Sequence, residues 1–323
     1  MKSAARWFCF FGVLCLAPAT AFGANLFQED FEDTNFTARG WYDSTGGALS
    51  TAEFFAGARS FECRFAPGAT GCAGGSPARH LFTPSDAVYV SYYVKYSANY
   101  TGSNRQYHPH EFLILTNENG AYAGPAYTRL TAYIEQNEGI PLFALQDGQN
   151  IDVSRLNQDL TGVTEQRSTC GCNGVPAAEA ASTVSCYPVS TMYWNGKDWR
   201  AGGTPNSHAG TVYFGDTPGP RYKNDWHRVE AYFRLNSIQN GQGAPDGVIR
   251  YWFDGALIIE RTNVILRTAQ HPNMQWNQFM IAPWIGDGSP VDQTMWVDNL
   301  SVETTRPGAD TIPPAAPTNL TVQ

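Results

Sequence analysis

Two alternating runs of residues between positions 226 and 259 constrain the fold of this chain more than any other feature. The segment reads WHRVEAYFRLNSIQNGQGAPDGVIRYWFDGALII, in which apolar and polar side chains alternate with the period of two that is typical of β-strands. Asp254 and Gly255 are typical of a tight hairpin turn. Because strand side chains alternate between faces, Val229, Ala231 and Phe233 are expected on a core face.

The opposite face of these strands carries aromatic and charged side chains. Its members are Trp226, Arg228, Glu230, Tyr232 and Arg234 in the first run, and Arg250, Trp252 and Asp254 in the second. Neighbouring strands place such rows side by side. This surface suits a sugar polymer.

Similar strand-like runs recur along the whole chain, and turn-forming residues separate nearly all of them. They cover residues 25–31, 59–65, 88–96, 111–116, 129–136, 142–145, 211–214, 227–235, 248–253, 256–261, 277–284 and 294–302. The 31 glycines, 20 prolines and 13% aromatic residues favour strands and loops over helices. We therefore predict an all-β fold, an antiparallel two-sheet β-sandwich of the jelly-roll type.

The two ends of the chain differ in character from this middle part. Residues 1–23 combine a basic start, an apolar run and small residues at Ala19, Ala21 and Gly23, which predicts a secretory signal peptide that is too short to span a membrane. Residues 24–305 are expected to form the β-domain. Residues 306–323 read as a proline-rich linker followed by the start of a fibronectin type III-like segment. The mature protein is expected to be secreted, extracellular or periplasmic, with no membrane partner.

The charge balance narrows the set of partners. Loss of Lys2 and Arg6 with the signal peptide takes the 21 basic residues to 19, against 29 acidic ones, so the mature net charge is −10. Such a chain is a poor partner for nucleic acid or anionic lipid. If it binds a polyanion, its positive charges must gather in one groove.

Five cysteines lie in the mature region, and export favours disulfides. Cys63 and Cys72 would close one short loop, and Cys186 would pair with Cys170 or Cys172, which leaves one cysteine over. A zinc site at the last three is the alternative, but their spacing fits zinc poorly.

The segment SNRQYHPHEFLIL holds the densest group of candidate catalytic side chains. His108 and His110 lie one strand step apart and are expected to share a face with Phe112 and Ile114, with Arg105 nearby. Two imidazoles can supply a base and a neutralising charge over one sugar. The alternative is a pair of histidines that only caps loop carbonyls.

Two further strands present polar faces. Tyr133 is expected beside Arg129, and a cation lowers the pKa of a phenol towards a range useful for proton transfer. Tyr93 and Lys95 form a second outward pair. The alternative for both is packing or a solvated strand face.

Acidic residues near the two ends of the domain suggest a structural calcium site. The opening strand carries Asp30 and Glu32, and the last strand carries Asp298. First and last strands often pair in antiparallel sandwiches, and Ca²⁺ prefers such oxygen ligands. We expect a Ca²⁺ ion that joins the termini.

Several segments together resemble a family of secreted proteins. They are FQEDFED, GARSFECRF, VYVSYYVKYS, DWHRVEAYFRLNS, GVIRYWFDG and MWVDNLSV. The chain resembles polysaccharide lyases of the concanavalin-A-like jelly-roll class (the lectin/glucanase type of sandwich), and within it the glucuronan lyases of family 20 and the alginate lyases of family 14. The likeness spans most of residues 25–303 and lies mainly in the strand pattern.

This resemblance implies β-elimination on a uronate-containing, anionic polysaccharide without an organic cofactor, by a protein expected to be monomeric. A cation holds the C6 carboxylate, a base removes the C5 proton and an acid protonates the leaving oxygen. The resemblance implies Arg129 or Arg228 for the cation. It implies His108 or His110 for the base.

For the acid, the resemblance implies Tyr133 or Tyr232, and Trp252 would offer a stacking platform for a sugar ring. The substrate-binding candidates are Arg105, Tyr93, Lys95, Glu230, Arg250 and Trp252.

Two other functions fit the same fold, because a fold does not determine function. A non-catalytic, lectin-like module would depend on exposed aromatics, of which Trp199, Trp252 and Trp284 are candidates. A glycoside hydrolase would need two carboxylates at one cleft, with Glu111 and Glu230 as the first pair to compare.

Overall fold

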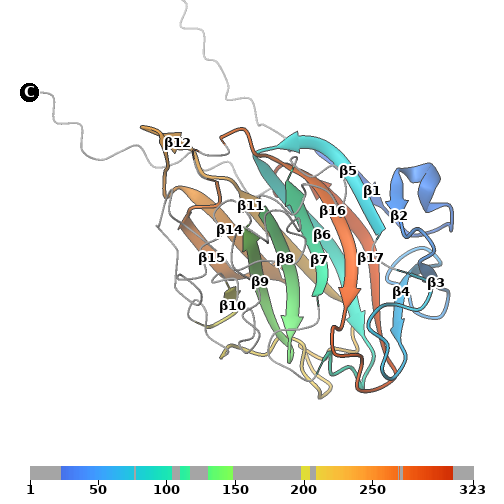
Figure 1. The fold of residues 1–323 in the computed structure, drawn as a ribbon. Coiled ribbons are helices and arrows are strands. Elements are labelled where there is room, and N and C mark those ends of the chain that lie inside the picture. The colour runs from blue at the N-terminus through green and yellow to red at the C-terminus, as the bar shows by residue number, and fades with distance from the viewer. Residues whose placement is uncertain are drawn as a thin grey trace, which may run out of the picture.

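The computed structural model describes residues 23–75, 78–103, 110–116, 130–147, 198–203, 209–267, 269 and 272–307. These residues form two antiparallel β-sheets that stack as a sandwich (Figure 1). The predicted all-β sandwich is confirmed. Among the described residues, no helix is long and apolar enough to cross a membrane.

The first sheet has eight strands. Its order is β15 (Ala256–Val264), β14 (Gly247–Phe253), β11 (His227–Arg234), β6 (Ala87–Tyr96), β17 (Gln293–Glu303), β4 (Ser60–Phe65) and β3 (Ala48–Ser50), and β1 (Asn25–Glu29) also pairs with β17. The expected pairing of the opening and closing strands is therefore present, with Glu29 opposite Leu300.

The second sheet has seven strands, in the order β10 (Asp198–Arg200), β9 (Ile140–Asp147), β8 (Leu130–Asn137), β7 (His110–Thr116), β16 (Trp276–Trp284), β5 (Ala78–Ser85) and β2 (Trp41–Asp43). A small hairpin of β12 (Ile238–Gln239) and β13 (Gln242–Gly243) lies in the connection between β11 and β14, and η1 (Phe36–Arg39) is a 3₁₀ turn.

The alternation seen in the sequence sets the core between the sheets. Val229, Ala231 and Phe233 of β11 point into it, as do Ile249 and Tyr251 of β14. Between β14 and β15, the turn residues Asp254 and Gly255 both have positive φ, which confirms the predicted tight hairpin. The core face and the opposite face of this segment are as predicted.

One predicted strand is wrong. Residues 211–214 form a loop, in which the N–H groups of Tyr213 and Phe214 both donate to the carbonyl of Gly139. Phe214 is buried against Tyr96 and Phe253. The apolar residues of this segment thus cover the end of the sandwich instead of joining a sheet.

The predicted Cys63–Cys72 disulfide is present and joins the end of β4 to the loop that follows it. Cys170, Cys172 and Cys186 lie outside the described residues, as do the predicted signal peptide up to residue 22 and the linker after residue 307. Their roles stay predictions.

Candidate functional site

The predicted site residues lie on the outer faces of two different sheets. In β6 and β11, alternate residues fill the core, so Tyr93, Lys95, Arg228 and Tyr232 point outward from the first sheet. In β8, Leu130, Ala132 and Ile134 fill the core, and Tyr133 points outward from the second sheet. These predicted residues therefore do not share one surface, because the whole apolar core separates the two faces. Arg105, His108 and Arg129 lie outside the described residues.

On the second sheet, His110 and Tyr133 are in contact. Their ring centroids are 4.6 Å apart and the planes are inclined by 49°. Tyr133 is buried in an apolar surround of Leu113, Leu115 and Met280. An imidazole and a phenol at this separation can serve as a base and an acid on one small group.

The orientation of His110 differs from the prediction. Phe112 and Ile114 point into the core, whereas the His110 ring lies against Tyr133 on the outer face. The strand register shifts at this point, because Ile281 pairs with Phe112 but Trp284 pairs with His110, which leaves one extra residue in β16. A bulge of this kind redirects a side chain at the end of a strand.

Trp284 lies next to His110 at the end of β16 and is 47% exposed. Of the three tryptophans expected for a lectin-like module, Trp199 is 1% exposed and Trp252 is 7% exposed. Trp284 is therefore the one that can stack on a sugar ring. Its position beside His110 places an exposed ring next to the candidate acid–base pair.

Two arginines flank this pair on the same face. Arg200 lies on the outer face of β10, because its neighbour Trp199 fills the core. In the register of the sheet, Arg200 is opposite Leu142 of β9, and Leu142 is opposite Glu135 of β8. Arg79 lies on the other side, opposite Met280. Strands are about 4.8 Å apart, so Arg79 is on the order of 14 Å from Tyr133 across three strand spacings.

Arg79 is already engaged by its neighbours. It forms an ion pair with Asp43, donates a 3.2 Å hydrogen bond to Gln278 and lies over the Tyr42 ring. Arg79 was missed at the sequence level because ARHLFTPS of β5 lacks the alternation of the other strands. Its position opposite Met280 could be found only from the pairing of β5 with β16.

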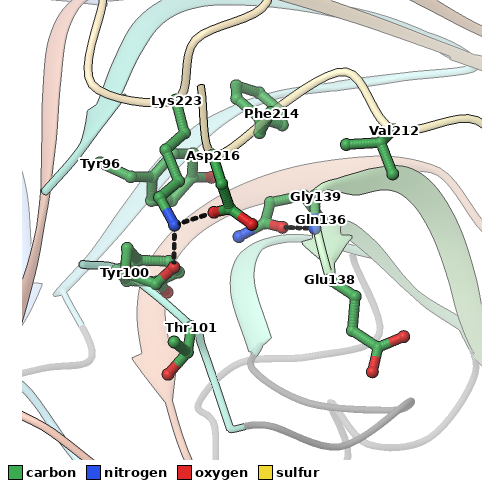
Figure 2. Close-up of a pocket in the computed structure, with 10 residues that line it drawn as sticks. All are labelled: Tyr96, Tyr100, Thr101, Gln136, Glu138, Gly139, Val212, Phe214, Asp216 and Lys223. Carbon is green, nitrogen blue, oxygen red and sulfur yellow. Dashed lines mark hydrogen bonds and ion pairs between the residues drawn. The ribbon is translucent and has the colours of Figure 1, made fainter. Parts of the chain in front are cut away.

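A cavity of about 270 Å³ lies at the end of the sandwich (Figure 2). Its wall includes Tyr96, Gln136 and Lys223, and the Lys223 ammonium donates to the carbonyl of Tyr100 and pairs with Asp216. The volume is below the usual range for ligand pockets, and these charges already satisfy one another. We therefore do not assign the substrate to this cavity.

Glu111 is buried behind the Tyr96 wall of this cavity. The Tyr96 hydroxyl lies 2.9 Å from both carboxyl oxygens and donates to them. Burial raises the pKa of Glu111 to about 8. Glu111 therefore carries a proton at neutral pH and is an interior group.

The outer face of the first sheet is organised around Glu230. This buried carboxylate accepts hydrogen bonds from Tyr89 at 2.6 Å and from Arg306 at 2.8 and 3.1 Å, with Arg228 at 3.5 Å. Burial alone would raise the pKa of Glu230, but the Arg306 and Tyr89 hydrogen bonds and the two positive charges outweigh it and lower that pKa. Burial and the adjacent carboxylate raise the pKa of Tyr89 far above its usual value.

This arrangement changes what can be expected of the predicted residues. The Arg306 guanidinium lies 4.7 Å from the centre of the Trp252 ring, so Trp252 is covered and is not the exposed platform that was predicted. Tyr232 is buried in the same cluster. Arg250 pairs with Glu260 at 2.8 Å. Glu230 lies on the outer face of the first sheet, whereas Glu111 belongs to β7 of the second sheet and is buried against Tyr96 between the sheets, so the two do not form the carboxylate pair of a hydrolase.

The predicted calcium ligands bind backbone N–H groups. Asp298 accepts from Phe55, Ala56 and Asn299, and Glu32 accepts from Ala58. In the part of the chain that the structure describes, no three His, Cys, Asp or Glu side chains gather closely enough to hold a metal ion. Asp30, Glu32 and Asp298 thus do not form the expected trio, and calcium binding stays a prediction.

Comparison with known proteins finds no matching family model and no matching curated protein. Among solved structures, alginate lyase vAL-1 from Chlorella virus is 14% identical, covers 80% of this chain and 90% of its own, and has a TM-score of 0.46. The endo-beta-1,4-glucuronan lyase from the fungus Trichoderma reesei is 13% identical, with 88% and 95% covered and a TM-score of 0.43. The PL-14 alginate lyase from Aplysia kurodai is 12% identical, with 89% and 100% covered and a TM-score of 0.47.

By their names, two of these proteins are alginate lyases and one is a glucuronan lyase. At this level of identity, a function for this chain must be supported by its own residues.

Proposed function

We propose that this protein is a polysaccharide lyase that cleaves a uronate-containing polysaccharide by β-elimination on the outer face of the second sheet. The contact between His110 and Tyr133 carries the proposal, because it joins a base and an acid beside the exposed Trp284. We also propose that the protein is secreted, acts as a monomer and takes an anionic polysaccharide as its substrate.

The reaction assigns one role to each group. His110 removes the C5 proton of the uronate, and the electrons of that bond form a double bond between C4 and C5. The C4–O4 bond breaks, and Tyr133 donates its proton to O4 as the chain end leaves. Trp284 stacks on an adjacent sugar ring.

The C5 proton becomes acidic only when the negative charge of the C6 carboxylate is balanced. We assign this role to Arg200, which lies outward on the same face, two strands from β8. Arg228 cannot serve because it lies on the other side of the sandwich. Arg129 precedes β8 directly and stays a prediction for the same role.

Two variants test the proposal. His110→Ala and Tyr133→Phe should each lower the rate of β-elimination about a hundredfold or more, as removal of a general base or acid does. The assay follows the ultraviolet absorbance of the new double bond on alginate, glucuronan and related polyuronates. The matched control is Tyr232→Phe, which removes a buried hydroxyl from the opposite face.

The outcomes are distinct. A fall in rate for the first two variants, with an unchanged rate for the control, supports the site. Equal rates in all three would contradict it, as would a fall only for Tyr232→Phe.

Non-catalytic glycan binding is the second candidate function, and the exposure of Trp284 favours it. In that case, polyuronates would be retained by the protein without new unsaturated ends. Trp284→Ala would then weaken binding, while His110→Ala would leave binding unchanged.

A further inference from the structure

Four aromatic side chains, two of them exposed and two half-buried, lie at the first sheet on the side of the sandwich away from His110. We call Phe54, Phe55, Tyr93 and Trp226 the aromatic patch. Phe54 is 40% exposed and Phe55 is 42% exposed. The Phe55 ring stacks on Tyr93 at 3.5 Å and 11°, and Trp226 meets Phe55 edge-on at 6.2 Å. Grouped exposed aromatics on a protein surface mark an interaction site.

The loop that presents the two phenylalanines is held firmly by buried acceptors. The Asp298 carboxylate accepts the N–H groups of Phe55 at 2.8 Å and Ala56 at 3.0 Å. Ser50 accepts from Glu53, and Glu53 pairs with Lys95 at 2.8 Å. A loop anchored in this way keeps its aromatic rings in place before any ligand arrives, which lowers the entropy lost on binding.

A positive charge that reaches solvent lies next to the stacked rings. Arg228 pairs in register with Tyr93, and its side chain is 39% exposed. The four carboxylates around Arg228 are already bound to other groups. Glu230 is shared by Arg228 and Arg306, and Asp298 accepts three backbone N–H groups. Glu53 pairs with Lys95, and Asp254 binds His227 and the backbone N–H of Arg228. Arg228 itself also donates to Ser91 and Tyr89, both at 3.2 Å, and the exposed part of its guanidinium is the positive charge that this surface offers to an anion.

We propose that the aromatic patch and Arg228 form a second, non-catalytic binding surface for an anionic polysaccharide. Flat rings stack on sugar faces, and a guanidinium beside them pairs with a uronate carboxylate. The proposal takes its ligand class from the proposed function. It adds that the sandwich holds polymer on both outer faces, with cleavage at one of them.

Affinity electrophoresis in native gels containing alginate or glucuronan tests this surface without turnover. All proteins carry His110→Ala, which removes the proposed base from the opposite face and protects the polymer during the run. The test variants are Phe55→Ala and Phe54→Ala. The control is Leu257→Ala, which shortens another exposed apolar side chain on the same sheet.

We expect Phe55→Ala to raise the apparent Kd about fivefold to tenfold, because it removes one stacking ring. Phe54→Ala should have a smaller effect, and Leu257→Ala should have none. The retardation should also weaken with added salt, since a guanidinium–carboxylate contact at the surface is screened.

Unchanged retardation in both phenylalanine variants would overturn the proposal. It would also be overturned if size-exclusion chromatography showed a dimer that Phe55→Ala converts to a monomer, because a second copy would then cover the patch. Retardation that depends on Phe55, together with no lyase activity in the protein that keeps His110, would refute the proposed reaction and leave this binding surface standing.

Discussion

The outer faces of the two sheets both arise from the alternation of side chains along the strands, but the side chains that they carry interact differently. On the first sheet, Glu230 binds Tyr89, Arg306 and Arg228, and Arg306 covers Trp252. On the second sheet, His110 and Tyr133 meet in an apolar surround, and Trp284 beside them is exposed. Most charged side chains of the first face are bound to one another and stabilise it, whereas the proposed reaction needs the contact between His110 and Tyr133 beside an exposed ring.

The largest effect expected from this comparison is on stability at the first face. Glu230→Ala leaves Arg306, Arg228 and the Tyr89 hydroxyl without their shared acceptor, which should lower the free energy of unfolding by about 3–5 kcal/mol. Urea denaturation measures the change. Glu260→Ala, which removes an exposed partner of Arg250, is the control and should cost under about 1 kcal/mol. Equal losses of unfolding free energy in the two variants would show that the Glu230 cluster stabilises the fold no more than an exposed ion pair does.

The interior between the faces should give the next largest effect, as a dependence of stability on pH. The pKa of Glu111 is about 8 in the folded protein against an ordinary value of 4.5. Between these values only the folded state holds the proton, so unfolding releases it. The free energy of unfolding should therefore fall as pH rises, by up to about 1.4 kcal/mol per pH unit.

Glu111→Gln should remove this slope, since an amide oxygen still accepts from Tyr96 but does not titrate. Denaturation curves at several pH values between about 5 and 7 measure it. An unchanged slope in the variant would mean that other groups produce the pH dependence.

A smaller effect is expected where the C-terminal end of the described chain covers the first sheet. Arg306→Ala uncovers Trp252 and removes one of two guanidiniums from Glu230, which should cost about 1 kcal/mol. Arg64→Ala breaks an exposed ion pair with Asp292 and is the matched control, with no measurable change expected. If the two variants unfold alike, the Arg306 contact does not stabilise this face.

The smallest effect concerns the predicted calcium ion. If a site at Asp298 has a Kd on the order of 1 mM, an equal concentration of Ca²⁺ would stabilise the protein by about 0.4 kcal/mol. Thermal unfolding with and without Ca²⁺ measures the shift in Tm, and Asp298→Asn should abolish it. No shift in the Tm of the unchanged protein at any Ca²⁺ concentration would contradict the predicted calcium site.

Local patterns in the sequence were sufficient for the strongly alternating strands and their faces. The alternation of β11 and β14 placed Val229 and Tyr251 inside and Arg228 and Glu230 outside, and the Asp254–Gly255 turn followed from its two residues. These features depend on neighbours along the chain, because a strand has a period of two and a tight turn needs residues that tolerate positive φ.

The candidate site could not be assembled in this way. Each of His110 and Arg228 was correctly assigned to a strand, but β7 pairs with β16 in one sheet and β11 pairs with β6 in the other. The alternation of side chains along a strand is a local property, whereas the sheet that a strand joins and the register shifts within it are settled by partners more than a hundred residues away.

The sequence by itself thus determined an all-β sandwich, the buried half of each strong strand and the Cys63–Cys72 loop. Only the tertiary structure decided that His110 meets Tyr133 through a register shift, that Arg306 covers Trp252, and that the two sets of polar groups lie on opposite sides. The reason is physical: periodicity fixes which face of a strand avoids water, while long-range pairing and packing fix which side chains on the other face become neighbours.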